Sequence, residues 1–475
     1  MNVVSWVVLA LITVGAAAAA GHALLSKRDP RAALGWIAVC LMFPLAGPAL
    51  YFLFGFNRIR TRARKLQAQS GPRTSDGDDA AVDVAAMSVD DVPDEFRELA
   101  RISDAVTGWP LVGGNAVELM HSGEQVYPAM LEAIERASKT LYLATYIFES
   151  NTTGERFVDA LADAAGRGVD VRVMIDGVGE LYSLPRASRL LSKAGVRVAR
   201  FLPPKLIPPT VHINLRNHRK LMVVDGRMGF TGGMNIGDRH LAESRDNPAR
   251  AVDAHFRVQG PVLEQLERVF LDDWEFVTGE ETDSNDGPPP AVGGAICRGI
   301  IDGPDDDLDK LVTVMVGAVS AARERVAIMS PYFLPPPGLS AALQAAALRG
   351  VDVGVILPSQ NNLPFVDWAT RNTLFELLRW GVHVYYQPPP FVHSKLFIVD
   401  GHYAQIGSAN IDPRSLRLNF EFAVEVYDSA FASTLGAHFE SVRDRSRQVT
   451  VAEIEARPLP VKARDALAWL FSPYL

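Results

Sequence analysis

The chain is poor in cysteine, in metal-ligand patterns and in net positive charge. Only two of its 475 residues are cysteines, Cys40 and Cys297, so two free thiols are expected rather than a disulfide framework. Neither has a Cys or His nearby at zinc-ligand spacing, and the sequence therefore predicts neither a metal site nor a cofactor. The formal net charge of −8 makes nucleic acid a poor substrate, because proteins that bind polyanions usually carry a basic surface.

Two long uncharged apolar runs, residues 3–25 and 32–56, lie at the N-terminus. Each reaches the roughly 20 residues needed to cross a bilayer, so residues 1–66 are expected to form a two-helix membrane hairpin with a basic flank. A cleaved signal peptide is the alternative for the first run, but no Lys or Arg precedes it and a second run follows at once. Pro44 and Pro48 favour a kink in the second run, which leaves a shallow hairpin open.

Positive charge around the hairpin predicts its orientation. Five basic residues lie between positions 58 and 65, against three in the loop 27–31. The positive-inside bias therefore favours a multi-pass protein of the cell membrane with its catalytic part in the cytoplasm. The basic flank is also expected to lie against anionic lipid headgroups.

Composition divides the rest of the chain. Residues 67–110 begin with an acidic stretch too poor in apolar residues to fold alone and are expected to be a linker and lead-in. Residues 280–292, rich in acid, Gly and Pro, separate a first half, 111–279, from a second half, 293–475. The amphipathic tail 463–475 is expected either to rest on the membrane interface or to dock on the second half.

The most informative pattern is His-x-Lys-x4-Asp-x6-Gly-x2-Asn, which occurs twice. Five fixed residues match by chance about once in several million positions, so two copies indicate a duplicated active site. The first copy consists of His218, Lys220, Asp225, Gly232 and Asn235, and the second of His393, Lys395, Asp400, Gly407 and Asn410.

The duplication extends beyond this motif. The apolar segment 141–148 is echoed by 326–333, and the segment 164–175, Ala-Ala-Gly-Arg-Gly-Val-Asp-Val and onward, is echoed by 346–357. Each half therefore runs through a strand, a helix, a second strand, another helix and the His-Lys strand. This order predicts an α/β fold with two similar halves, each a mixed sheet flanked by helices.

Two imidazoles around one phosphate ester can act as nucleophile and as general acid and base. Each lysine follows its histidine by two residues, so the two side chains share one face of a strand. Each aspartate is seven residues from its histidine and precedes a glycine, so Asp225 and Asp400 are expected mainly to fix turns. Asn235 and Asn410 are expected to donate amides to the phosphate, with Gly232 and Gly407 allowing close backbone approach.

Other candidates lie near the motifs. A carboxylate is expected to orient each imidazole: Glu421 is the best candidate in the second half and Asp253 a weaker one in the first. Tyr146 and Tyr332 end apolar strands and are expected either to line the substrate or to pack in the core, whereas Phe148 and Phe333 favour the core. Asp412, Arg414 and Ser415 form a turn pattern that could simply cap a helix. The proline-rich stretch 203–209 with Arg200 and Lys205 is expected to be a stiff loop at the cleft mouth.

With these features the chain resembles the phospholipase D superfamily and, within it, the bacterial cardiolipin synthases. The resemblance rests on the hairpin, both motifs, the segment 330–335 and the continuations 410–415 and 419–421. It implies two pseudo-symmetric phospholipase D-like lobes in which the His, Lys and Asp of each motif are all required. It also implies that His218 attacks the phosphorus and His393 acts as acid and base, an assignment that the residues themselves leave reversible.

The resulting prediction is a membrane cardiolipin synthase. It would join two phosphatidylglycerol molecules through a phosphatidyl-histidine and release glycerol, with phosphatidylglycerol, cardiolipin and the bilayer as partners and a homo-oligomer compatible with the sequence. A phospholipase D hydrolase and a synthase that takes phosphatidylethanolamine as donor remain alternatives. A nuclease of the superfamily is disfavoured by the acidic charge, and a scaffold without activity by the completeness of both motifs.

Overall fold

The computed structural model describes residues 3–27, 30–55, 86–204, 215–281, 289–304 and 309–472. The chain forms two compact units, residues 1–71 with 204–212, and residues 72–203 with 213–475. The predictions for the basic flank 58–65, for Lys205 and for most of the acidic stretch fall outside the described residues.

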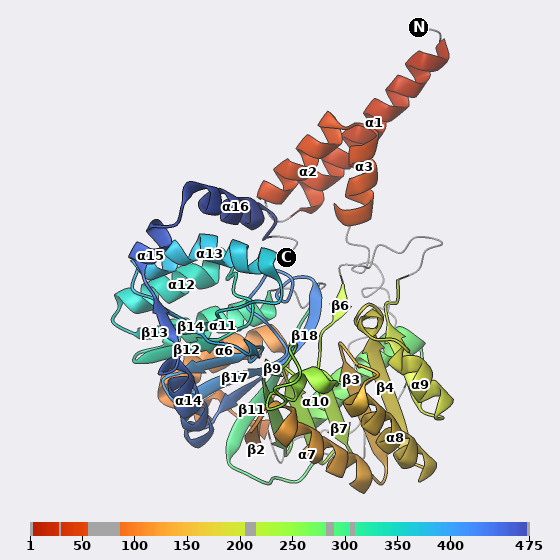
Figure 1. Cartoon of the computed structure of the whole chain (residues 1–475), viewed down its shortest axis with the longest axis vertical. Helices are drawn as coiled ribbons and strands as arrows, with labels where there is room; N and C mark the ends of the chain where they lie inside the picture. The colour runs from red at the N-terminus through yellow and green to blue at the C-terminus, as the bar shows by residue number, and fades with distance from the viewer. Residues whose placement is uncertain are drawn as a thin grey trace. The chain divides into compact units, whose positions relative to one another are not determined.

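The first unit is a helical hairpin made of α1 (Val3–Ser26), α2 (Pro30–Met42), α3 (Ala46–Leu50) and the π-helical turn η1 (Tyr51–Gly55) (Figure 1). Helices α1 and α2 pack together through small residues, with Ala20 and Ala23 buried against Cys40 and Tyr51. Only α1, among the described helices, is long and apolar enough to cross a membrane, with a mean hydropathy of 2.3.

The second apolar run is not one continuous helix. The second apolar run stops at Met42 and resumes at Ala46, on either side of Pro44. A proline lacks the amide hydrogen of the helix ladder and its ring clashes with the preceding turn, so the run is broken into short helices. This is the kinked form of the hairpin that the prolines favoured.

The second unit is built on one 17-stranded mixed sheet that crosses both halves of the chain. The first lobe (residues 111–279) contributes neighbours in the order β5-β4-β3-β7-β8-β10-β2, and the second lobe (residues 295–470) continues with β11-β18-β17-β16-β12-β13-β14-β19. In each lobe three parallel strands, β3, β4 and β5 or β12, β13 and β14, lie beside an antiparallel meander. The two lobes join where β2 pairs antiparallel with β11.

The strand bounds are β1 Ala86–Met87, β2 Leu111–His121, β3 Thr140–Thr145, β4 Asp170–Asp176, β5 Arg197–Phe201, β6 Arg216–Asn217, β7 Leu221–Val224, β8 Met228–Gly232, β9 Ala251–Val252, β10 Ala254–Gln259, β11 Ala295–Asp302, β12 Arg325–Met329, β13 Asp352–Pro358, β14 His383–Gln387, β15 Phe391–Val392, β16 Leu396–Val399, β17 Tyr403–Gly407, β18 Asn419–Tyr427 and β19 Arg447–Val449.

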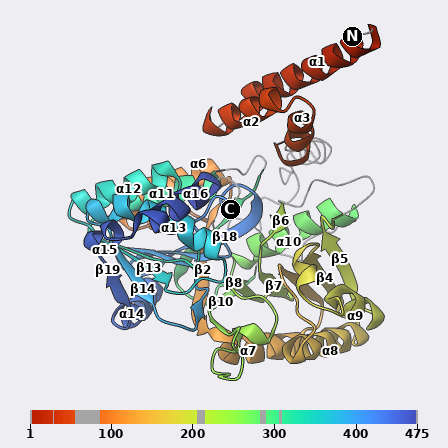
Figure 2. The ribbon, with the colours of Figure 1, turned by 45° about the horizontal axis from the view of Figure 1, so that its top comes forward.

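Helices cover both faces of the sheet in each lobe. In Figure 2, α7 and α8 lie below the strands of the first lobe and α10 above them, while α11, α12 and α13 lie above those of the second lobe and α14 below. The bounds are α7 Ser122–Arg136, α8 Thr152–Gly166, α9 Ala187–Lys193, α10 Leu263–Thr278, α11 Lys310–Ala321, α12 Pro337–Leu348, α13 Pro364–Arg379, α14 Ser429–Arg443, α15 Val451–Glu455 and α16 Leu459–Leu470. The predicted α/β class with two similar halves is confirmed.

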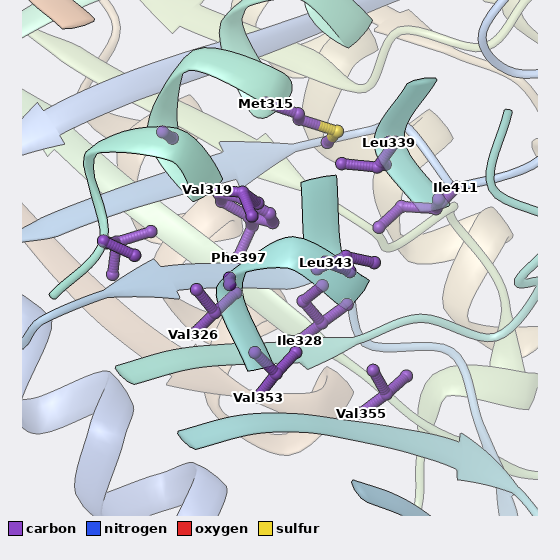
Figure 3. Close-up of a cluster of buried hydrophobic side chains, with 14 of the residues drawn as sticks. Met315, Val319, Val326, Ile328, Leu339, Leu343, Val353, Val355, Phe397 and Ile411 are labelled. Atoms are coloured by element: carbon purple, nitrogen blue, oxygen red, sulfur yellow. The ribbon is translucent and has the colours of Figure 1, made fainter. Parts of the chain in front are cut away.

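Each lobe has its own apolar core beneath its helices. Figure 3 shows the second core, where Val326 and Val353 from parallel strands meet Val319 of α11 and Leu343 of α12. β-Branched residues on strands buried on both faces are the composition expected of parallel sheets.

The lead-in to the first lobe packs on the second lobe. Helix α6 (Arg97–Thr107) lies against α11, and Val92, Phe96 and Leu99 are buried in the second core. The lead-in part of residues 67–110 thus belongs to a core distant in sequence, because the apolar residues of α6 recur at helical spacing.

The C-terminal tail packs on the second lobe, which is one of the two positions expected for it. Helix α16 packs on α13, with Ala468 buried beside Val366 and Ala369. The two cysteines are free and buried, as predicted.

Candidate active site

The two histidine segments meet because each pairs with a strand of the other lobe. Strand β6, just before His218, runs parallel to the start of β18, while β15, just before His393, runs parallel to β9. The pairing continues through the histidines themselves: the amide of His218 donates to the carbonyl of Phe420 at 2.9 Å, and that of His393 to the carbonyl of Val252 at 2.8 Å. The exchange is reciprocal and brings both motifs to the boundary between the lobes.

This register places one carboxylate beside each imidazole. Glu421 follows Phe420, and its carboxylate oxygens lie 2.9 and 3.0 Å from Nδ1 of His218. Asp253 follows Val252, and its Oδ2 lies 2.8 Å from Nδ1 of His393. Each of the two carboxylates named from the sequence lies beside a motif imidazole, but in both cases it is the histidine of the opposite half rather than of its own half. Since the strands are exchanged between lobes, so are the carboxylates.

The Glu421 carboxylate is held as an anion. It is fully buried and accepts hydrogen bonds from Ser408 Oγ at 2.6 Å and Asn419 Nδ2 at 3.1 Å. Burial acts to raise the pKa of the Glu421 carboxyl, but His218, Lys220 and Ser408 lower it to about 2. Burial lowers the pKa of His218 to about 4, against the pull of Glu421. At neutral pH the neutral imidazole therefore donates its Nδ1 proton to Glu421 and keeps the lone pair on Nε2.

The Asp253 carboxylate is in a different setting. Its Oδ1 accepts the amide of Ala254 at 2.9 Å, and burial raises the pKa of its carboxyl. Two further buried histidines stand around it, His255 and His240, the latter with Nδ1 at 3.7 Å from Oδ2. Burial and the charge of Lys395 lower the pKa of His393 well below its usual value. The sequence analysis missed His240, although it follows Asn235 by five residues just as Ser415 follows Asn410.

Both motif lysines are buried, and each lies against the histidine of its own motif. Nζ of Lys220 donates to the carbonyl of His218 at 2.8 Å and lies 5.6 Å from the ring centre of Tyr146, which itself contacts the His218 ring at 5.2 Å. Nζ of Lys395 donates to the carbonyl of His393 at 2.6 Å. Burial lowers the pKa of Lys220 to about 7, assisted by the charge of Lys395, and the pKa of Lys395 to about 8. Two cations in one buried site favour an anionic ligand.

The motif aspartates hold turns, as their spacing predicted. Asp225 and Gly226 both have positive φ, +51° and +61°, in a two-residue hairpin turn closed by the bond from Arg227 N to Val224 O. The Asp225 carboxylate accepts the amides of Lys139 and Thr140 at 2.7 and 2.9 Å. Burial acts to raise the pKa of the Asp225 carboxyl, but these bonds lower it overall. Asp400 repeats the arrangement with the amides of residues 323–325.

The motif asparagines are placed by equivalent contacts. Ile236, next to Asn235, bridges to Phe148, and Ile411, next to Asn410, bridges to Phe333. Oδ1 of Asn235 accepts a hydrogen bond from the amide of Ile147 at 3.1 Å. The NH2 group of Asn235 therefore points away from Ile147. Nδ2 of Asn410 instead donates to Ser415 Oγ at 3.1 Å. Both asparagines are buried, and Asn235 lines the same small cavity as Lys220.

The aromatic and glycine predictions also have clear outcomes. Phe148 and Phe333 are core residues, as favoured, whereas Tyr146 and Tyr332 are half-buried beside His218 and His393. At Gly232, with φ of +144°, a Cβ would lie 2.8 Å from Cα of His255 on the neighbouring strand. This is the close approach that the motif glycine was expected to allow.

Arg200, expected beside the stiff proline-rich loop, forms an ion pair with Glu180 at 3.7 Å.

The asparagine continuation 410–415 forms a turn rather than a long helix. Asp412 Oδ1 accepts the amide of Ser415 at 2.8 Å, and the carbonyl of Arg414 accepts the amide of Asn419 at 2.9 Å. The turn thereby fixes the start of β18 and so the position of Glu421.

Comparison with known proteins agrees with this architecture. Residues 130–274 and 315–443 match the family described as cardiolipin synthase, PLD-like domain, and residues 5–55 match the phospholipase D-nuclease N-terminal family. The chain is 31% identical over 466 residues to the major cardiolipin synthase ClsA of Bacillus subtilis (strain 168), which covers 94% of this chain and 95% of that protein. It is 33% identical over 475 residues to cardiolipin synthase A of Pseudomonas entomophila (strain L48), with 96% and 95% covered.

Solved structures share the fold at lower identity. The phosphatidylserine synthase of Haemophilus influenzae Rd KW20 aligns with a TM-score of 0.62 and 15% identity, over 79% of this chain and 100% of that one. The two lobes and their paired motifs thus define a phosphatidyltransferase of the phospholipase D-like class. Given its identity to curated relatives over nearly its whole length, the chain belongs to the cardiolipin synthases of that class.

Proposed function

We propose that the protein joins two phosphatidylglycerol molecules into cardiolipin and glycerol through a phosphatidyl-histidine. The observation that carries the proposal is the pair of buried imidazoles, each hydrogen-bonded to a carboxylate of the opposite lobe, with the two buried motif lysines nearby. Such a site suits one phosphodiester with its phosphorus between the two Nε2 atoms and its oxygens near the lysines and asparagines.

In the first half-reaction, Nε2 of His218 attacks the phosphorus of the donor lipid. The bond from phosphorus to the glycerol oxygen breaks, and His393 gives that oxygen its proton. The phosphodiester charge offsets the nearby lysines and so raises the pKa of His393, which lets it carry this proton. In the second half-reaction, His393 takes the proton from the terminal hydroxyl of a second phosphatidylglycerol, whose oxygen displaces His218 from phosphorus.

The unequal carboxylates support His218 as the nucleophile. A phosphorylated imidazole that keeps its Nδ1 proton is cationic, and a permanently ionised partner stabilises it. The pKa of about 2 fits Glu421 to this role, whereas the raised pKa of Asp253 fits a partner whose histidine gains and loses a proton in each half-reaction.

The N-terminal hairpin is proposed to anchor the enzyme in the cell membrane with the catalytic unit on the cytoplasmic side. Helix α1 is long enough to span the bilayer, and the basic residues 58–65 outnumber those between the helices. The substrate would then be drawn from the leaflet that the enzyme faces.

Mass spectrometry of the products tests the reaction. Full-length enzyme in detergent micelles with phosphatidylglycerol, a chelator and no nucleotide is expected to form cardiolipin and glycerol in equal amounts. Phosphatidic acid as the main product would make the protein a hydrolase. A requirement for phosphatidylethanolamine or a cytidine-nucleotide lipid as donor would also overturn the proposal.

A further inference from the structure

Arg216 is a buried arginine without a carboxylate partner. Four arginines of the described residues are buried, and three of them form ion pairs: Arg172 with Asp170, Arg219 with Asp273 and Arg298 with Glu425. The guanidinium of the fourth, Arg216, donates to the carbonyl of Leu215 at 3.3 Å, and no carboxylate of the described residues lies within ion-pair distance of it. Asp176 acts on Arg216 electrostatically, but its oxygens accept the amides of Val178, Gly179 and Asn217 rather than the guanidinium. Because removing a guanidinium from water without a paired anion is costly, a functional ligand is the natural counterion.

The position of Arg216 ties it to the reaction centre. It precedes His218 by two residues in the extended segment that pairs with β18, so the two side chains lie on the same side about 7 Å apart along the chain. Tyr146 lies on that side as well, with its ring 5.2 Å from that of His218. Burial raises the pKa of the Tyr146 hydroxyl, and the charge of Arg216 acts in the opposite direction.

The second motif has no such basic position. The residue two before His393 is Phe391, whose ring lies 5.9 Å from the His393 ring and 6.5 Å from Tyr332. The symmetric centre formed by histidines, lysines and asparagines therefore has one basic flank, next to His218, and one aromatic flank, next to His393.

We propose that Arg216 binds the phosphate of the acceptor lipid. The inference rests on the proposed function, because a site that makes cardiolipin must hold two phosphates at once. The donor phosphate lies at the histidines and lysines, and the offset of Arg216 along the strand is a distance that the glycerol bridge of the product can span. A guanidinium suits this role because it binds two phosphate oxygens together. Arg216 would favour an acceptor alcohol that carries a phosphate over glycerol or water.

Two acceptors separate this role from a general one. Full-length enzyme in micelles is given phosphatidylglycerol alone, which measures cardiolipin formation, or phosphatidylglycerol with labelled glycerol, which measures label entering phosphatidylglycerol. Both reactions break and remake the same phosphorus–oxygen bond through the same phosphatidyl-histidine, but labelled glycerol has no phosphate. Arg216→Gln is expected to slow cardiolipin formation by about 10- to 100-fold, the loss of one charged hydrogen-bond pair, while glycerol exchange stays within about threefold.

Two further variants serve as controls. Arg216→Lys keeps the positive charge but cannot bind two phosphate oxygens with two parallel N–H groups. It is therefore expected to retain an intermediate rate of cardiolipin formation. Arg227→Gln, at an exposed turn, is expected to change neither reaction. Equal losses of both reactions in Arg216→Gln, or cardiolipin formation at the wild-type rate, would overturn the acceptor site. Wild-type enzyme that exchanges glycerol but forms no cardiolipin would instead overturn the proposed function, and this inference with it.

Discussion

At the scale of single residues, the two halves of the site are similar in geometry and different in charge. His218 has a carboxylate that stays ionised, with a pKa of about 2 for Glu421, whereas burial raises the pKa of Asp253 beside His393. In the proposed mechanism, this difference suits the His218 end to a covalent intermediate and the His393 end to proton transfer.

Replacing either motif histidine tests this division. His218→Ala and His393→Ala are each expected to abolish turnover, and the double variant to be scarcely slower than either, because the two act as a unit. Acid quenching with labelled lipid should trap a covalent adduct in His393→Ala and none in His218→Ala. Label found only on His393 of the wild-type protein would reverse the two roles.

The lysines predict the alkaline side of the pH profile. In the proposed mechanism their ammonium forms bind the phosphate, and with a pKa of about 7 for Lys220 and about 8 for Lys395 they lose charge as the pH rises through this range. We expect kcat/KM, which reports the free enzyme, to fall above about pH 7 to 8. In Lys395→Arg the introduced arginine stays charged, so the alkaline limb of the kcat/KM profile should show a single ionisation, that of Lys220. A profile that is flat up to pH 9 would contradict the prediction.

At the scale of secondary-structure elements, local chemistry was predictable and long-range pairing was not. The turns after Val224 and Val399 could be predicted because each has an Asp-Gly pair whose aspartate lies an odd number of residues from its motif histidine. The pairing of β6 with β18 and of β15 with β9 joins segments far apart in sequence, and no local pattern encodes it. For that reason the carboxylates could be named from the sequence, while their exchange between lobes and the position of His240 beside Asp253 could not.

The turn aspartates allow a test between a structural and a catalytic role. Asp225→Ala removes the acceptor of three backbone amides and one hydroxyl at the start of β3, and is expected to destabilise the protein by about 1–3 kcal/mol. Asp163→Ala, on an exposed turn of α8, should change the free energy of unfolding by no more than about 0.5 kcal/mol. Thermal unfolding measures both.

Activity below the unfolding transition decides the role of Asp225. If the carboxylate only holds the turn, folded Asp225→Ala protein should keep turnover within about threefold of wild type. Complete loss of turnover in a protein with a cooperative transition would show that the aspartate takes part in the reaction, as the family resemblance implies.

At the scale of the whole molecule, the polypeptide crosses between lobes more often than its sequence suggests. The fold class followed from the repeat, because strands alternate with helices in the same order in both halves. The position of α6 did not, since an amphipathic helix preceding the first lobe gives no sign that it packs on the second. Likewise the length of the second apolar run suggested a spanning helix, and only its prolines indicated the break.

Two truncations test this organisation. Removing residues 1–66 should leave a folded catalytic unit, because the buried residues of both lobes begin at Val92. Binding to phosphatidylglycerol liposomes should fall sharply with the loss of α1, whereas activity in micelles should suffer less.

Removing residues 1–107 should instead destabilise the second lobe strongly, since Phe96 and Leu99 leave a cavity against α11 and Arg298 loses its bond to the carbonyl of Ala100. Phe96→Ala in the full-length chain gives the matched single-site comparison, with an expected loss of about 3–5 kcal/mol in the free energy of unfolding.

Thermal unfolding followed by circular dichroism distinguishes the two truncations. If the 1–107 deletion unfolded at the same temperature as the 1–66 deletion, α6 would not belong to the second core. If the 1–66 deletion lost all micellar activity despite a cooperative transition, the hairpin would contribute directly to the active site or to an oligomer.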